Sequence, residues 1–140
     1  MGHYDIPMNE SYPSFEEPLR RDPDPRSQLL YRVFLLLKEV FPESIRKEHV
    51  LEVVNRPIRV VTLFYVLNPK PNLRALKFAV TENATTAMLV VAKLYDTGSI
   101  GLPELESRSV EREVLANDCW DAFIGWVSYV KEIYEKELKP

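Results

Sequence analysis

The sequence predicts an all-α fold, a compact helical bundle around an apolar central helix. Three observations predict it. Apolar residues follow Asp24-Pro25 at helical spacing; the segment 81–98 has a polar start, an apolar run and a stop at Gly98; and residues 117–134 carry an aromatic stripe opposite a charged face. The alternative is an α+β fold in which helices pack on a three-stranded antiparallel meander at 57–97, where β-branched and aromatic residues are frequent.

The N-terminal segment 1–26 is predicted to be an irregular or disordered proline-rich arm. It holds five of the eleven prolines, many acidic residues and few aliphatic ones. Such a composition buries little apolar surface and does not favour a packed core. The remaining residues, 27–140, suffice for a single globular domain.

The first helix is predicted to begin at Asp24-Pro25, because aspartate suits the cap and proline the first turn. Pro42 ends it. A second helix is predicted over about 43–54, capped by Ser44. Its stripe consists of Ile45, His49, Val50, Val53 and Val54. His49 is expected to be a half-exposed member of this stripe.

The middle of the chain leaves helix and strand open. The run "PIRVVTLFYVL" (57–67) favours a strand, yet Asn55 and Pro57 also suit a helix start. The run "NLRALKFAV" (72–80) has apolar residues at helical spacing. In the all-α interpretation, the candidates for the central helix are 84–97 and 28–41.

The C-terminal third is predicted to form two helices. One begins at Pro103 and includes Val110 and Leu115, and the last is capped by Asn117 or Asp118. In that last helix the stripe consists of Trp120, Phe123, Ile124, Val127, Val130 and Tyr134. Trp120 and Trp126 are six residues apart, which offsets them by about 120° around a helix. We therefore expect Trp120 in the core and Trp126 at an edge.

Composition excludes several classes of function. The net charge is −3 and no basic block is present, so binding to nucleic acid or to anionic membranes is not expected. The longest apolar runs are too short to span a bilayer, so no integral membrane segment is expected. The single cysteine, Cys119, rules out an internal disulfide, and no apolar N-terminal segment is present. These features predict a cytoplasmic, reducing location.

The sequence contains no recognisable catalytic or cofactor site. The two histidines are His3 and His49, which cannot form a metal constellation, and the four glycines form no phosphate-binding loop. Carboxylates fall at the spacings of solvated helix faces. We therefore predict a protein that is not an enzyme and needs no cofactor.

The stretch "NDCWDAF" (117–123) resembles the second homology motif of the Bcl-two family of apoptosis regulators, Asn-Gly-Gly-Trp-Asp/Glu-x-Phe. The matching residues are Asn117, Trp120, Asp121 and Phe123, whereas Asp118 and Cys119 replace the two glycines. The resemblance is to divergent viral members of the family, which are often short.

A second stretch, "FAVTENATTAMLVV" (78–91), is similar to the first homology motif of that family. Phe78 and Asn83 keep its spacing, but Thr85 and Thr86 stand where the family has Gly-Arg. In the family that arginine pairs with an aspartate of the bound death-motif peptide, so the ordinary mode of peptide capture is in doubt. The Leu-x-x-x-Gly-Asp motif of the family is also missing from the second predicted helix.

The resemblance implies a non-enzymatic interaction module that regulates apoptosis by binding an amphipathic death-motif helix in a hydrophobic groove. The predicted partner-binding residues are Val53, Val54, Phe64, Leu67, Leu76, Phe78, Asn83 and Trp126. For each of them the plain alternative is that it fills the core. The alternative function is that of a viral structural or assembly protein that self-associates, as a homodimer or larger homo-oligomer, through exposed aromatic residues.

Overall fold

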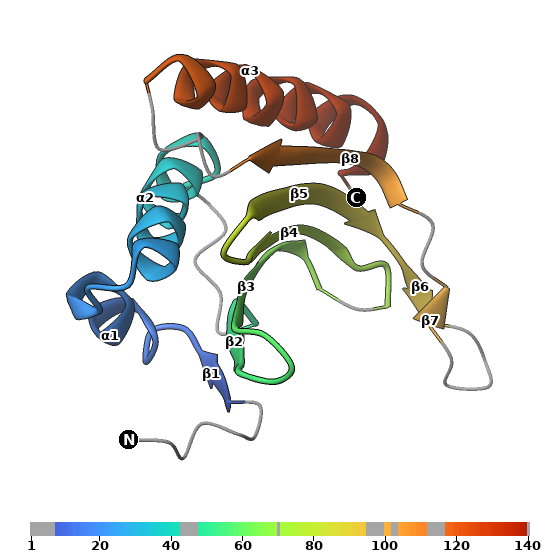
Figure 1. The fold of residues 1–140 in the computed structure, drawn as a ribbon. Coiled ribbons are helices and arrows are strands. Elements are labelled where there is room, and N and C mark those ends of the chain that lie inside the picture. Colours follow the sequence, from blue (N-terminus) through green and yellow to red (C-terminus); the bar gives the residue numbers. More distant parts are fainter. Residues whose placement is uncertain are drawn as a thin grey trace.

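The chain folds as an α+β protein built on an antiparallel sheet (Figure 1). The computed structural model describes residues 8–42, 48–69, 71–94, 100–101, 104–111 and 117–139. The strands are β1 (Met8–Ser11), β2 (Val50–Val54), β3 (Val60–Asn68), β4 (Arg74–Val80), β5 (Ala84–Val91), β6 (Lys93–Leu94), β7 (Ile100–Gly101) and β8 (Glu104–Glu111). The helices are α1 (Glu16–Arg21), α2 (Pro25–Val40) and α3 (Asn117–Ile133), and α3 continues into a π-helical turn, η2 (Tyr134–Leu138). The all-α prediction is therefore wrong, and the α+β alternative comes closer.

The sheet has six strands in the order β1-β2-β3-β4-β5-β8, and every neighbouring pair is antiparallel. Its centre, β3-β4-β5, is the meander that the alternative interpretation places within 57–97. Strands β1 and β2 extend it on one side and β8 on the other. The short pair β6-β7 forms a separate ribbon.

Helices α2 and α3 pack on the same face of the curved sheet (Figure 1). The Tyr65 hydroxyl on β3 donates to the carbonyl oxygens of Leu37 and Phe41, at 3.3 Å and 3.1 Å, where α2 ends. The Phe78 ring on β4 meets the Phe123 ring of α3 edge-on, with centroids 5.6 Å apart. These contacts place the core between the sheet and the two long helices.

The start of α2 confirms the sequence prediction. Asp24 caps α2, because its Oδ1 accepts a hydrogen bond from the backbone N–H of Arg26 at 2.9 Å, and Pro25 occupies the first turn. The helix ends at Val40 and Phe41 caps it, one residue before Pro42. Helix α3 begins at Asn117, so Asn117 and Asp118 are its first residues rather than its cap, and residue 116 lies outside the described part.

The segment that the sequence predicts as an irregular arm contributes to the core. Within 1–26, residues 8–11 form β1 and residues 16–21 form α1, whereas residues 1–7 lie outside the described part. Phe15 is fully buried, and the Tyr12 N–H donates to the His49 carbonyl oxygen at 3.0 Å. Phe15 and the buried Leu19 of α1 therefore anchor this proline-rich segment to the core.

Four predicted helices are wrong where the structure describes them. Residues 50–54 of the helix expected at 43–54 form β2, and residues 43–47 lie outside the described part. The helices expected at 72–80 and 84–97 are replaced by β4 and β5, and the one expected from Pro103 by β8. Residues 95–97 and 112–116 are not described.

His49 is buried rather than half-exposed. It precedes β2, its exposed fraction is 1%, and its ring stacks on Tyr65 with centroids 4.1 Å apart. Its Nδ1 accepts a hydrogen bond from the Val66 N–H at 2.9 Å. The imidazole therefore completes the backbone hydrogen bonding of β3 from inside the core.

Candidate functional site

The two faces of the sheet have different neighbours. Side chains alternate along a strand, so Leu63, Tyr65 and Leu67 of β3 face the helices, and Thr62, Phe64 and Val66 face the other way. The paired positions Val50, Phe64, Lys77, Met88 and Ser107 form one row across this second face, from β2 to β8. No helix of the described residues covers it (Figure 1). We call it the open face.

The open face is more apolar than an antiparallel sheet that faces water requires. Such a sheet shows hydrophobic residues on the core side and polar residues on the solvated side. On β3 this face carries Val60, Thr62, Phe64 and Val66, and on β5 it carries Met88 and Val90. Val60, Phe64 and Met88 are half-buried, whereas Thr62, Val66 and Val90 are already buried, with 5%, 5% and 6% of their surface exposed. A strand that is apolar on both faces is typical of a sheet that is covered on both faces.

The open face is also hollowed. A depression of about 540 Å³ lies over β2, β3 and the connection between β3 and β4. Its apolar lining includes Val50, Phe64, Val66, Leu73 and Ala75. An apolar depression of this size can accept side chains from another molecule.

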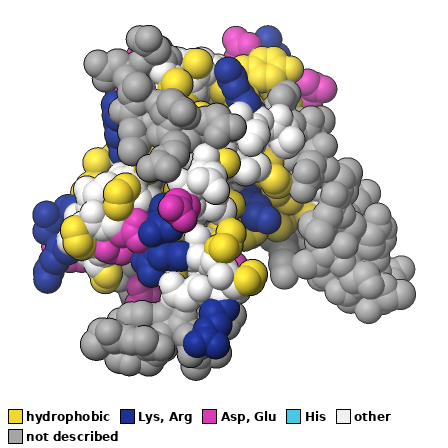
Figure 2. Space-filling view, viewed as in Figure 1, with side chains coloured by type: hydrophobic (Ala, Val, Ile, Leu, Met, Phe, Trp, Pro, Cys, Tyr) yellow, Lys and Arg dark blue, Asp and Glu magenta, His cyan; other side chains and the backbone are white. Residues whose placement is uncertain are grey.

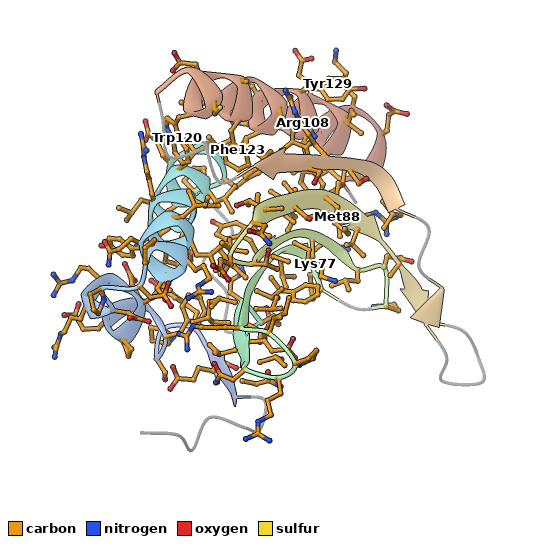
Figure 3. All side chains as sticks on the ribbon, viewed as in Figure 1. Lys77, Met88, Arg108, Trp120, Phe123 and Tyr129 are labelled. Carbon is orange, nitrogen blue, oxygen red and sulfur yellow. The ribbon has the colours of Figure 1, made fainter. Side chains whose placement is uncertain are left out.

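Charges of both signs border the depression. Glu48 and Glu52 contribute to its lining, and Glu48 is exposed. On the neighbouring strand the Lys77 Nζ lies 5.6 Å from the centroid of the Phe64 ring, a cation–π distance. Figure 3 shows Lys77 and Met88 on adjacent strands, and Figure 2 shows basic and hydrophobic side chains side by side over the strands. The surface thus offers acidic, basic and apolar groups close together.

The loop between β2 and β3, residues 55–59, projects from the same two strands. Arg59 fixes its base, because its Nε lies 2.9 Å from Asp24 Oδ2 and its Nη1 donates to Asn55 Oδ1 at 3.1 Å. Burial alone would raise the pKa of Asp24, but the hydrogen bonds from Arg26 and the charges of Arg26 and Arg59 lower it below its usual value. The carboxylate that caps α2 therefore also holds the loop.

The structure does not bring the eight predicted partner-binding residues into one groove. Three of them, Leu67, Leu76 and Phe78, are buried in the core on the helix side. Val53 is half-buried and lies on that side too, because it pairs with Val61. Asn83 is exposed in the turn between β4 and β5. Only Val54 and Phe64 of the eight lie on the open face.

The two tryptophans exchange the roles that the sequence predicts. Trp126 is buried, with 4% of its surface exposed, and its ring stacks near Phe123. Trp120 is half-buried, and the Arg32 guanidinium lies 4.0 Å from its ring centroid. Helix α3 packs on a sheet instead of closing a bundle. The side of α3 that faces Phe78 on the sheet carries Trp126, so Trp126 is the tryptophan in the core.

A second depression, of about 460 Å³, lies between β8 and α3. Arg108, Gly125, Trp126 and Tyr129 contribute to it, and Figure 3 shows Arg108 and Tyr129 near one another. The Trp126 Nε1 is buried and has no hydrogen-bond acceptor in the described part of the chain. Its smaller apolar surface and exposed arginine make it the weaker candidate for a hydrophobic interface.

The described residues form neither a metal site nor a membrane-spanning helix. They contain no group of three or more His, Cys, Asp or Glu side chains placed to hold a metal ion. No helix among them combines the length and the apolar character needed to cross a bilayer.

Comparisons with known proteins return no relative. No protein-family model, no curated protein and no solved structure matches the chain. The described residues do not form the helical cleft that the Bcl-two resemblance requires, because six of the eight residues expected to line it belong to the strands β2, β3 and β4.

The open face could have been found from the sequence by one signal. The run "VVTLFYVLN" is apolar at both odd and even positions, which hides the alternation expected of a half-exposed strand. Its even-numbered residues on the open face, such as Phe64 and Val66, contribute more to the candidate site than the aromatic stripe of α3 does.

Proposed function

We propose that this chain is a non-enzymatic assembly protein that self-associates through the open face of its sheet. The observation that carries the proposal is the apolar character of β3 on both faces, with the half-buried Phe64 in a depression on the face that no helix of the described residues covers. Antiparallel sheets in water keep one face polar unless something covers it. A second copy of the chain can cover the apolar side chains of this face that remain partly exposed, such as Phe64 and Met88.

The charges of the open face support a copy of the same chain as the partner. Glu52 and Lys77 lie on one surface, two strands apart, so the surface carries groups that can complement those of a second copy. The net charge of −3 is small, so long-range repulsion between copies is weak.

Self-association is tested by light scattering coupled to size-exclusion chromatography between about 1 and 500 µM, a range that brackets micromolar affinity. We expect mass that rises with concentration. A carboxylate in an apolar contact is costly, so Phe64→Glu and Met88→Glu should each shift the protein toward monomer. Tyr129→Glu is the matched control, because Tyr129 is 51% exposed on α3 and lies away from the open face.

A strict monomer across this range, with the far-ultraviolet dichroism of a folded protein, would refute the proposal. Equal loss of association in the Tyr129→Glu control would place the interface elsewhere. The two open-face variants act on different strands, so one remains informative if the other fails to fold.

A further inference from the structure

The loop between β2 and β3 carries the most exposed large hydrophobic residue among those the structure describes. Ile58 is 57% exposed, compared with 51% for Tyr129 and 43% for Leu35. Leu35 and Tyr129 lie along the sides of helices, whereas Ile58 stands at the end of a hairpin. A projecting side chain can enter a depression that a flat helix side cannot.

The surroundings of Ile58 match those of the depression on the open face. Arg56 and Pro57 next to it are exposed. The depression has an apolar lining that contains Phe64 and Val66, and the carboxylate residues Glu48 and Glu52 border it. An isoleucine flanked by an arginine therefore finds an apolar floor and acidic groups, the arrangement that electrostatic complementarity favours.

The loop is held in place before any contact forms. Arg59, beside Ile58, bonds to Asn55 across the base of the loop and lies 2.9 Å and 3.6 Å from the carboxylates of Asp24 and Asp22. A segment that is already ordered loses less conformational entropy when it binds. Ile58 is thus exposed on an anchored loop rather than on a loose one.

The depression cannot be filled by the loop of the same molecule. The loop follows the pair Val54–Val60, whereas the depression contains Val50 and Phe64, further along the same two strands. The pair Val50–Phe64 lies four residues along the strands from the pair Val54–Val60, which is about 13 Å at 3.3 Å per residue. A loop of this kind can therefore reach a depression only when it comes from another copy of the chain.

We infer that self-association is head-to-tail: the loop at Arg56–Ile58 of one copy inserts Ile58 into the open-face depression of the next, with Arg56 toward Glu48 and Glu52. This inference rests on the proposed function and names the partner of the same surface. Two different patches meet in such a contact, so it is heterologous, and it leads to rings or open filaments instead of a closed two-fold dimer.

The test uses one variant at each end of the contact. Ile58→Asp removes the loop end and leaves the depression intact, whereas Phe64→Glu disables the depression and leaves the loop intact. A carboxylate in an apolar contact should weaken self-association by at least about tenfold in each. Because Ile58 is exposed, its substitution should not unfold the domain. Leu35→Asp is the control, as Leu35 is exposed on α2.

We expect the unsubstituted chain to form species larger than a dimer at high concentration in analytical ultracentrifugation, and each variant alone to stay monomeric. An equimolar mixture of Ile58→Asp and Phe64→Glu should form a one-to-one heterodimer and nothing larger, because one loop and one depression remain. This rescue is the signature of a heterologous contact.

Three outcomes would overturn the inference, and they differ in what they leave standing. In the first, Ile58→Asp assembles like the unsubstituted chain. In the second, the unsubstituted chain forms only a dimer, and the mixture of the two variants does not restore it. Either result would mean that the loop is not the partner, although the open face still associates. If the unsubstituted chain is a monomer throughout, the proposed function fails as well.

Discussion

Two phenylalanines on opposite faces of the sheet provide a direct test of the assignment of the faces. Phe78 on β4 is fully buried, and its ring lies 5.6 Å from Phe123 and 6.3 Å from Trp126, centroid to centroid. Phe64 on β3 is half-buried on the open face, beneath Lys77. The same substitution, Phe→Ala, should therefore have different consequences at the two positions.

We expect Phe78→Ala to lower the free energy of unfolding by about 3 to 5 kcal/mol, the range for a phenylalanine removed from a packed core. Phe64→Ala leaves no enclosed cavity and loses part of one side chain's apolar contact, so about 1 kcal/mol is expected. With a urea m value of about 2 kcal/mol/M, the denaturation midpoints of the two variants should differ by about 1 to 2 M.

The assay is equilibrium urea denaturation followed by far-ultraviolet dichroism, at about 1 µM protein so that micromolar self-association does not add to stability. Dichroism is preferred to tryptophan fluorescence because Phe78 contacts Trp126. Coincident midpoints for the two variants, or a greater loss in Phe64→Ala than in Phe78→Ala, would refute the assignment of helix side and open face.

Three further substitutions test local features of the structure. Asp24→Asn keeps a capping side chain but removes the charge. The pKa of Asp24 in the folded state is lowered from 3.8, so the unsubstituted chain should lose stability as the pH falls below that value. Thermal melts at falling pH should show a smaller loss of stability for the variant than for the unsubstituted chain. Tyr65→Phe removes the hydroxyl that bonds to the end of α2 and should lower the free energy of unfolding in urea by about 1 to 2 kcal/mol. An unchanged denaturation midpoint would contradict the hydrogen bonding of this hydroxyl. Gly125→Ala should raise the free energy of unfolding by about 1 kcal/mol, because a Cβ at Gly125 meets no atom within 4 Å and alanine favours the helix. The gain should appear as a higher melting temperature. A lower melting temperature would mean that another atom occupies the space beside Gly125.

The sequence predicts the two long helices because their end signals are local. Asp24-Pro25 fixes the start of α2, and the apolar spacing that follows is sustained over 16 residues. Helix α3 likewise has a 17-residue run with one charged face. Long periodic segments with capping residues carry enough local information to identify a helix without tertiary contacts.

The same local signals do not predict the strands, and the physical reason differs from strand to strand. In β2, Val50, Val53 and Val54 happen to have helical spacing, and the choice of strand depends on pairing with β3, ten residues further along the chain. In β3 the apolar residues on both faces remove the two-residue period. In β8 the charged and serine residues look like a solvated helix face, although they belong to the last strand of the sheet.

The candidate site could not be predicted from the sequence, because it depends on which face of the sheet a side chain lies on and not on the residue type. Leu76 and Phe64 are both apolar members of strands, but Leu76 is fully buried against the helices and Phe64 borders the depression. A shift of one residue in register would exchange these roles. Only the long-range pairing of β3 with β2 and β4 decides which set of side chains forms the interface.

The two edges of the sheet are poor routes to assembly, which favours the open face. Within the described residues the edge strand β1 has four residues, and β8, at the other edge, has charges at four of its eight positions, Glu104, Glu106, Arg108 and Glu111. Short edge strands and charged edge residues are common protections against edge-to-edge pairing. A protein whose edges discourage pairing but whose open face remains apolar is suited to association through that face. Insertion of the anchored Ile58 loop of one copy into the depression of the next then makes this association head-to-tail.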